Sequence, residues 1–294
     1  MSVSAIITTY KRDYEGLRRA IESVINQTYQ DIEIMVINDT PKEDPLFKEI
    51  ESKIKEYGDR VNYYAEGINQ GACFVRNFGV EKSKGQYIGF LDDDDEWEPL
   101  KIEEQVEILE KYQYPMTTVN FVICTIKSNG EIIKKKRKSI KKIISYNDIL
   151  KKNNVGGASA PLIRRSAFMQ AGGFDNSMPA AQDYDLWIRI AELGNIYYID
   201  KVLQKYNIYE GERISNSSRK KIIGYKKLLE KYANANLNNK SFLISKNIVI
   251  SYHYYKLGDK KNGWKYYKLA TKAGIFNLSL FYYSVKIFKE LIGR

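Results

Sequence analysis

The first 91 residues alternate between short, mostly apolar runs and longer amphipathic stretches. The short runs at residues 3–9, 32–37, 61–65 and 87–91 are rich in Val, Ile, Tyr and Ala, which predicts strands. Helices are expected between them at about 13–27, 41–57 and 72–83, the first with Leu17, Ile21 and Val24 on one face. This alternation predicts a Rossmann-like, mostly parallel sheet covered by helices on both faces.

Polar side chains follow the first two predicted strands, at the edge where ligands of open α/β sheets bind. They are Thr8, Thr9, Tyr10, Lys11 and Arg12 after the first strand, and Asn38 and Asp39 after the second. An aromatic ring can stack on a base, a carboxylate can accept from a ring N–H, and Arg can bind phosphate. The set suits a nucleoside pocket, whereas each residue alone is a common turn or cap residue.

Four consecutive carboxylates, Asp92–Asp95, end the last of these apolar runs. Like charges at the end of a buried strand repel one another, so a divalent cation is a natural partner. Mg²⁺ or Mn²⁺ held by one or two carboxylates keeps open positions for phosphate oxygens. Acidic runs in general are more often solvated turns. Here the preceding strand, with Trp97 and Pro99 after the run, favours a metal site that anchors a nucleotide diphosphate.

The net charge of +11 is unevenly distributed over the 294 residues. Residues 215–294 carry 17 Lys and Arg against the acids Glu230, Asp259 and Glu290, a net charge of +14, so the first 214 residues carry −3. This shift predicts a domain boundary near Arg213. A basic, tyrosine-rich tail suits anionic lipid or polyanionic carbohydrate, and we expect no nucleic-acid partner.

Targeting signals are absent from the pattern. The chain enters an apolar strand directly, without a basic leader, so we expect no signal peptide, and no run approaches the roughly 18 apolar residues of a spanning helix. Cys73 and Cys124 form neither a disulfide framework nor a metal-ligand spacing, which fits a reducing compartment. We expect a cytoplasmic protein, either soluble or peripheral at the inner face of the membrane.

Five motifs, in this order, resemble the family 2 glycosyltransferases, which have a GT-A fold. They are Thr8-Thr9-Tyr10-Lys11-Arg12, Ser23-Val24-Ile25-Asn26-Gln27-Thr28-Tyr29, Val36-Ile37-Asn38-Asp39, Asn69-Gln70-Gly71-Ala72-Cys73-Phe74-Val75-Arg76-Asn77 and Phe90-Leu91-Asp92-Asp93-Asp94-Asp95. The resemblance implies a GT-A catalytic domain at 1–213, with a nucleotide-binding half at 1–97 and an acceptor-binding half at 98–213. A basic, all-helical appendage would follow at 214–294.

The resemblance also implies roles for single residues. Asp39 would contact uracil, Asp92 the ribose and the metal, and Asp94 the metal that bridges the two phosphates. The rest of the nucleotide site would consist of Thr8, Thr9, Tyr10, Arg12, Asn69 and Asp93. The cofactor would be Mn²⁺ or Mg²⁺.

Asp183 is the expected catalytic base, because inverting sugar transfer needs a group that takes the proton of the acceptor hydroxyl. It lies at the start of a helix predicted from the spacing of Leu186, Ile190 and Leu193. An Asp at a helix N-terminus also acts as a cap, and this alternative stays open. The resemblance favours the base, although the family usually has Glu before this position and this chain has Gln182.

Three further segments have two interpretations each. The small-residue run 154–160 borders the sugar pocket or is a plain loop. The basic run Lys134–Lys138, after a predicted hairpin at Asn129-Gly130, is a solvated loop or a docking point for a phosphate-bearing acceptor. The last helix carries Phe281, Val285, Phe288 and Ile292 on one face, so it either lies at a membrane interface or packs on its own domain.

One departure from the family limits the resemblance. Many relatives place a His near the diphosphate after the last strand, and this chain has Tyr209, with Arg213 and Ser215 shortly after. Arg213 is therefore the candidate for closing over the phosphates. The single histidine, His253, is expected on the surface of a tail helix.

The sequence thus predicts a metal-dependent, inverting glycosyltransferase that uses a nucleotide sugar, with a UDP-sugar favoured. Its acceptor would be a hydroxyl of a glycan or lipid-linked saccharide in cell-surface polysaccharide synthesis. A sugar-1-phosphate nucleotidyltransferase is an alternative, but it would normally open with a glycine-rich loop, and no glycine precedes Gly16. A non-catalytic basic module that binds membrane or nucleic acid is the second alternative.

Overall fold

The computed structural model describes residues 2–209, 217–232, 239–274 and 277–292, and they form two compact units. The first unit comprises Met1–Tyr146, Asn154–Asn176 and Leu186–Glu212. The second comprises Asn147–Asn153, Ser177–Asp185 and Arg213–Arg294. The domain boundary expected near Arg213 lies outside the described residues, and the second unit also takes two short segments from the middle of the chain.

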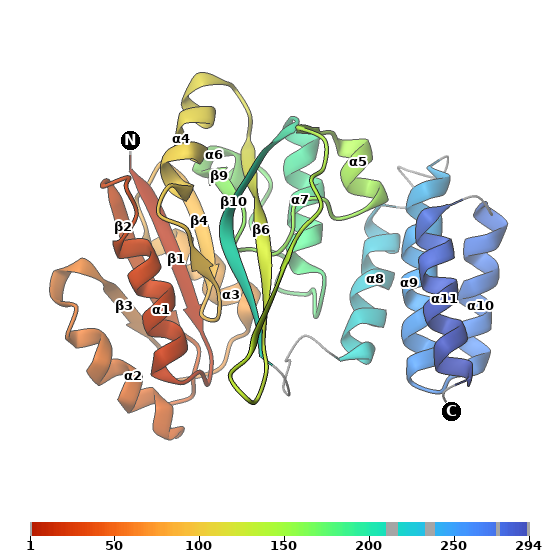
Figure 1. The fold of residues 1–294 in the computed structure, drawn as a ribbon, viewed down its shortest axis with the longest axis horizontal. Helices are drawn as coiled ribbons and strands as arrows, with labels where there is room; N and C mark the ends of the chain where they lie inside the picture. The colour runs from red at the N-terminus through yellow and green to blue at the C-terminus, as the bar shows by residue number, and fades with distance from the viewer. Residues whose placement is uncertain (1, 210–216, 233–238, 275–276, 293–294) are drawn as a thin grey trace. The chain divides into compact units, whose positions relative to one another are not determined.

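The first unit is built on one sheet, whose strands run in colour from red to teal in Figure 1. Its strands are β1 Val3–Thr9, β2 Ile32–Asn38, β3 Asn62–Ala65, β4 Tyr87–Asp92, β5 Glu96–Trp97, β6 Met116–Ile126, β7 Ile132–Lys136, β8 Ile143–Ile144, β9 Leu162–Arg164 and β10 Ile196–Tyr209. They are ordered β3-β2-β1-β4-β9-β6-β10-β5, with β7 beside β6 and β8 beside β10. Parallel pairs join β1 to β2 and β4, β2 to β3, and β6 to β10. They contain most of the paired residues, so the sheet is mostly parallel as predicted, whereas β5, β7, β8 and β9 pair antiparallel.

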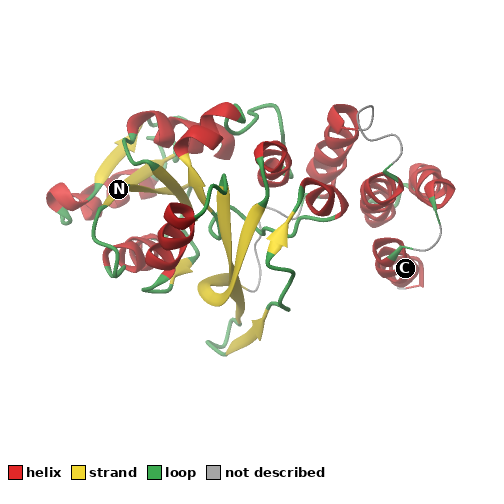
Figure 2. Ribbon diagram, turned by 90° about the horizontal axis from the view of Figure 1, so that it is seen from above, coloured by secondary structure: helices red, strands yellow, loops and turns green. Residues whose placement is uncertain are grey.

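Helices flank both faces of this sheet (Figure 2). They are α1 Tyr14–Ile25, α2 Pro45–Lys55, the short 3₁₀ helix η1 Gly58–Arg60, α3 Ala72–Lys82, α4 Lys101–Lys111, α6 Arg165–Gln170 and the larger part of α7 Gln182–Leu193. The caps explain where they begin. The Asp13 carboxylate accepts from the backbone N–H of Gly16, and Asp44 caps α2 immediately before Pro45. The second helix therefore begins four residues later than position 41, where the sequence placed it.

The side-chain alternation of the strands creates two separate cores. On one face, Ala5 and Ile7 pack with Leu17 of α1, Ile50 of α2 and Ile102 of α4. On the other face, α3 approaches β1 so closely that a Cβ at Gly79 would lie 2.5 Å from the Ile6 side chain. An aromatic cluster extends this second core along α6 and α7; its members are Phe90, Phe168, Phe174 and Trp187.

The basic run at 134–138 corrects one expectation. Lys134–Lys136 are not a loop but the second half of β7, which pairs antiparallel with β6 around the predicted Asn129-Gly130 turn. The strand is exposed along its whole length, and within the described part of the chain β6 is the one strand that pairs with it. Lysines on an edge strand discourage pairing with other chains, which accounts for their presence in a strand.

The second unit is all-helical. It contains residues 147–151 of α5 Tyr146–Lys151, the first turn of α7, and α8 Ser218–Tyr232, α9 Lys240–Lys256, α10 Lys260–Ala273 and α11 Leu278–Ile292. Helix α9 packs against α8, α10 and α11, so it is buried on most sides, with Ile244 and Ile248 in the core. Within the described residues, no helix is both long and apolar enough to cross a bilayer.

His253 is a second correction. It lies on α9 and is buried rather than on the surface, with Nδ1 3.1 Å from the Ser218 hydroxyl of α8. Burial, together with the charges of Lys221, Lys256 and Lys286, lowers the pKa of His253 to about 4. The sequence pattern did not predict the burial of His253, because helices pack on several sides of α9 and it therefore has no polar face.

Candidate active site

The turn after β1 carries the first predicted site residues. In the sheet, Thr8 lies beside Asp92 of β4, and Thr9 lies beside Asn38 of β2. Lys11 then adopts a left-handed backbone with φ of 49°, and its N–H donates to the Thr40 hydroxyl at 2.9 Å. A non-glycine residue in this region costs roughly 1 kcal/mol, so the surrounding contacts must hold it there. The turn places Tyr10 and Arg12 on either side of this strained residue.

Asp39, at the end of β2, holds the segment that leads into α3. Its carboxylate accepts from the backbone N–H groups of Gln70 at 2.7 Å and Gly71 at 2.9 Å, and from the Asn69 amide at 2.8 Å. Burial raises the pKa of Asp39, and the two backbone hydrogen bonds oppose that rise. The structure thus joins two predicted site residues, Asp39 and Asn69, directly.

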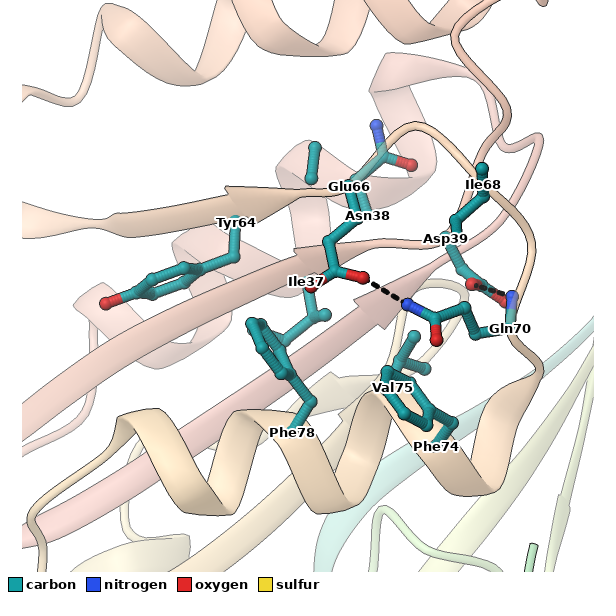
Figure 3. Close-up of a pocket in the computed structure, with 11 residues that line it drawn as sticks. Ile37, Asn38, Asp39, Tyr64, Glu66, Ile68, Gln70, Phe74, Val75 and Phe78 are labelled. Carbon is teal, nitrogen blue, oxygen red and sulfur yellow. Dashed lines mark hydrogen bonds between the residues drawn. The ribbon is translucent and has the colours of Figure 1, made fainter.

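A small hollow opens beside this segment (Figure 3). The rings of Tyr64, Phe74 and Phe78 and the side chain of Ile37 form its apolar wall, and Asp39 and Gln70 lie at its polar end. The Gln70 amide donates to Glu66 across its rim. Aromatic walls with a polar end suit a planar ligand that also carries hydrogen-bonding groups.

The four aspartates separate into two pairs that alternate along the turn after β4. Asp93 and Asp95 point inward and are 7 % and 1 % exposed. The side chains of Asp92 and Asp94 are 34 % and 31 % exposed and can reach a ligand. The exposed pair is therefore the spaced pair predicted to bind metal. Asp93, which was also predicted for the nucleotide site, is buried together with Asp95.

Two arginines form ion pairs with the exposed aspartates. Arg76 of α3 donates to Asp92 at 2.7 Å, and Arg12 donates to Asp94 at 3.0 Å and to Asp93 at 3.1 Å. Burial, with the charges of Asp92 and Asp93, raises the pKa of Asp94 to about 6, and Arg12 opposes that rise. The acid cluster is thus incompletely compensated and would gain from a further cation.

Asp95 ties the turn to the last strand of the sheet. It accepts from the Gln204 amide at 2.9 Å and from the backbone N–H of Asn207 at 3.1 Å, and Asn207 in turn donates to the Asp94 carbonyl at 2.8 Å. Burial and the neighbouring carboxylates raise the pKa of Asp95 well above its ordinary value. These contacts fix the backbone from which Asp94 projects.

The run 154–160 contains no strand, and it forms a loop that borders this cluster. The Ser159 hydroxyl accepts from the backbone N–H of Asp92 at 3.1 Å, and the Ser159 carbonyl accepts from the Trp97 indole at 2.9 Å. The loop therefore lies where a ligand of Asp92 would meet it.

The donor set fits a hard divalent ion. Among the described residues, no three His, Cys, Asp or Glu side chains gather to hold a metal by themselves. The protein offers two carboxylates, from Asp92 and Asp94. Mg²⁺ and Mn²⁺ accept such a site when water and phosphate oxygens complete the coordination.

Asp183 lies in the first turn of α7, in the second unit, and is half-buried. The residue two before it, Ala181, has a left-handed backbone with φ of 61°. Its neighbours are anchored within the second unit. Asp185 accepts from Lys231 and from Tyr232 of α8, both at 2.9 Å, and the Tyr184 hydroxyl donates to the Ile149 carbonyl of α5 at 2.7 Å. Strained backbone that is held so firmly is common at functional sites.

The end of β10 adds Tyr209 to the cluster. Its hydroxyl accepts from Arg19 of α1, burial raises its pKa, and the charges of Arg12 and Asp94 act on it as well. Arg213 and Ser215, considered above for the diphosphate, lie outside the described residues. Sequence reasoning missed the roles of Arg76, Ser159 and Asn207, because single residues distant in the chain give no spacing signal.

Comparison with known proteins identifies the family. A family model described as glycosyl transferase family 2 matches residues 4–172, more than half of the chain. The chain belongs to glycosyltransferase family 2. An uncharacterized glycosyltransferase of Rickettsia felis is similar to this family 2 chain, with 32% identity over 228 residues, 73% of this chain and 36% of the relative. This chain therefore corresponds to about a third of that relative's length.

A second relative is matched over most of both chains. Glycosyl transferase WcaA of Escherichia coli K12, whose name assigns it provisionally to colanic acid biosynthesis, is 29% identical over 76% of this family 2 chain and 78% of its own. Among solved structures, S. aureus TarS 1-349 in complex with UDP-GlcNAc has a TM-score of 0.59 at 14% identity, covering 94% and 93% of the two chains. GalNAc-T7 with UDP, GalNAc and Mn²⁺ has a TM-score of 0.61 at 18% identity, covering 90% of this chain and 55% of that one. These likenesses establish the GT-A fold.

Proposed function

We propose that the chain transfers a sugar from a UDP-sugar to a hydroxyl of a glycan or lipid-linked saccharide, with inversion and with a divalent metal. The observation that carries this proposal is the alternation in the acidic turn. Asp92 and Asp94 face outward at the carboxyl ends of the strands, while Asp93 and Asp95 are buried. Family membership favours this transferase over the nucleotidyltransferase and the non-catalytic module.

The nucleoside would bind between the β1 turn and the Asp39 segment. Tyr10 offers an aromatic face, and Asn69 and Gln70 offer amides beside the apolar hollow. Because Asp39 already accepts three hydrogen bonds, its first effect would be to hold Asn69–Gly71 in place, and its contact with uracil would use the remaining acceptor capacity.

The diphosphate would lie at Asp92 and Asp94. A bound Mn²⁺ or Mg²⁺, held by these two carboxylates, would act as a Lewis acid that stabilises charge on the departing diphosphate. Arg12 and Arg76 keep the carboxylates apart from one another and in fixed positions before ligand arrives. Arg12 also places positive charge beside the phosphate site.

Asp183 would accept the proton of the acceptor hydroxyl as that oxygen attacks the anomeric carbon. The N-terminus of a helix favours the charged form of a carboxylate, which is the form that a base needs. Inversion follows from a single displacement in which the acceptor oxygen forms its bond as the diphosphate leaves.

The comparisons support the finer parts of the proposal. The S. aureus neighbour was solved with UDP-GlcNAc and the GalNAc-T7 neighbour with UDP and Mn²⁺, which favours a UDP-sugar and a metal. The colanic acid assignment of the Escherichia coli relative favours polysaccharide synthesis. We propose a cytoplasmic location, peripheral at the inner face of the membrane, where lipid-linked acceptors are found.

The test is thermal unfolding with UDP, GDP, CMP and dTDP, each with and without Mn²⁺. A ligand at a hundredfold excess over its dissociation constant adds about 2.7 kcal/mol to the free energy of unfolding. We expect UDP to raise the melting temperature only with metal. Asp94→Asn should remove that shift, and Asp59→Asn, which alters an exposed acid elsewhere in the first unit, should retain it. A shift with UDP that is the same without metal would refute the metal-dependent site.

A further inference from the structure

Helix α11 carries two separate rows of apolar side chains. Leu280 and Ile287 face inward and pack with Ile244 and Ile248 of α9. A second row of apolar side chains, here called the outer face of α11, faces solvent: Leu278, Phe281, Val285, Phe288 and Ile292, with exposures of 89, 73, 42, 62 and 66%. The inner side explains how the helix folds, but it does not explain the outer face.

The spacing of the outer face is that of one helical stripe. Its members follow one another at three, four, three and four residues, so they lie in a row along about 22 Å of helix. Single exposed apolar residues are ordinary, but a contiguous stripe that includes two phenylalanines is rare on a surface that stays in water. The stripe therefore indicates a binding partner with an apolar layer.

The charge around the stripe indicates the sign of the charge on the partner's surface. Residues 239–292 contain ten lysines and only two acids, Asp259 and Glu290. Lys289 is exposed within the stripe, and Lys286 lies along its edge over the Tyr282 ring. The neighbouring helix α10 adds further exposed lysines, which are Lys260, Lys261, Lys265, Lys268 and Lys272. The partner must combine an apolar interior with negative surface charge.

We propose that the outer face of α11 binds the surface of an anionic lipid bilayer. The helix would lie in the plane of the interface, with its phenylalanines among the acyl chains and its lysines at the headgroups. A helix of 15 residues is too short to span the hydrocarbon layer. A second copy of this chain fits less well, because a self-complementary contact would bring lysine against lysine.

Vesicle flotation of the full chain tests whether the outer face of α11 binds lipid. The probes are vesicles of phosphatidylcholine alone and of phosphatidylcholine with phosphatidylglycerol. We expect binding to the anionic vesicles, and we expect the double variant Phe281→Gln/Phe288→Gln to weaken it by about a hundredfold. Met169→Gln, which replaces a similarly exposed apolar residue on α6 of the first unit, is the matched control and should bind as the unaltered chain does.

A second double variant tests how much the lysines contribute to vesicle binding. Lys286→Gln/Lys289→Gln should weaken binding to anionic vesicles by about tenfold or more and should reduce its sensitivity to salt. Equal binding to neutral and anionic vesicles would overturn the proposed charge selection.

Two further results would overturn the proposal as a whole. One is the absence of binding to anionic vesicles by the folded, unaltered chain. The other is a dimer mass in light scattering that disappears in the phenylalanine double variant, because a second copy would then cover the stripe. Flotation does not depend on sugar transfer, so this result stands apart from the UDP experiment. The helical circular-dichroism signal of each variant and its melting temperature show whether the helical unit remains folded.

Discussion

At the scale of single residues, Arg12 and Arg76 offset the negative charge of Asp92 and Asp94 before a ligand binds. A bound metal would share this role. Each arginine pairs with one of the two outward carboxylates, at 3.0 and 2.7 Å. Arg76 is mostly buried, and its guanidinium also lies over the Phe174 ring. The acidic turn is therefore stable without ligand but keeps an excess of negative charge.

Arg76→Met should leave Asp92 without its cation and lower the free energy of unfolding by about 2 kcal/mol, a value reduced for the partial exposure of Asp92. Mn²⁺ with UDP would supply the missing positive charge, so we expect a larger ligand-induced melting shift in this variant than in the unaltered chain. Arg60→Met, at an exposed arginine, is the control. A smaller shift in Arg76→Met would show that Arg76 contributes to binding instead of standing in for the cation.

His253 should make stability depend on pH. Its pKa in the folded protein is about 4, below the ordinary value of 6.5, so the unfolded chain takes up a proton first as the pH falls. The stabilisation that follows from this lowered pKa is complete above pH 6.5 and is lost as the pH falls towards 4. The free energy of unfolding should therefore decrease by about 2 kcal/mol between pH 7.5 and 5. Melting curves of the unaltered chain and His253→Gln should converge over this range. Parallel curves would contradict the assignment.

At the scale of elements, α8 holds the segment that carries Asp183. A Cβ at Gly224 would lie 2.4 Å from the Ala180 carbonyl oxygen, and Lys227 donates to the Ser177 carbonyl at 2.6 Å. Further along the helix, Lys231 and Tyr232 bind Asp185. Helix α8 therefore contacts this segment on both sides of the proposed base.

Gly224→Ala should push the Asp183 segment away from α8. We expect kcat to fall by about tenfold or more, because small displacements of a base are costly, while the Kd of UDP with Mn²⁺ stays unchanged. Ile223→Ala, at the exposed neighbouring position, should change neither value. An equal loss of UDP affinity and turnover would indicate general destabilisation instead of a positioning role.

The elements show what the sequence could and could not reveal. The strands at 3–9 and 87–91 and the helix at 72–83 were predictable within about one residue, because buried strands and amphipathic helices have clear periods. β7 was read as a loop, since lysines mask an edge strand, and His253 was misplaced. The Asp92–Asp95 run was visible, but its division into inward and outward pairs depends on turn geometry that periodicity does not encode.

At the scale of the whole molecule, the two units interleave along the chain. Residues 147–153 and 177–185 belong to the helical unit, and Lys246 of α9 donates to the Leu150 carbonyl at 2.9 Å and to the Tyr184 hydroxyl at 2.5 Å. Lys246 is fully buried, and burial lowers its pKa well below the ordinary value. The composition shift near residue 213 revealed the tail but not these two insertions, because they are too short to change local composition.

A chain that ends at Tyr209 should therefore keep the proposed binding of UDP and lose most of the proposed sugar transfer. We expect it to retain a metal-dependent melting shift with UDP, because Asp39, Asp92 and Asp94 lie in the first unit. Sugar transfer should fall by about a hundredfold or more, since the Asp183 segment loses its supports. Transfer at the full rate by this shortened chain would show that the helical unit is dispensable.

The interleaving also determines when the protein becomes competent during its synthesis. Tyr184 leaves the ribosome roughly 60 residues before Lys246, which is about 3–12 s at ordinary translation rates. Once Tyr209 has also emerged, the sheet and its acidic turn are complete in the nascent chain, but the partner that secures Tyr184 has not been made. Under the proposed function, a nascent chain of this length would bind the nucleotide sugar but would not yet transfer its sugar.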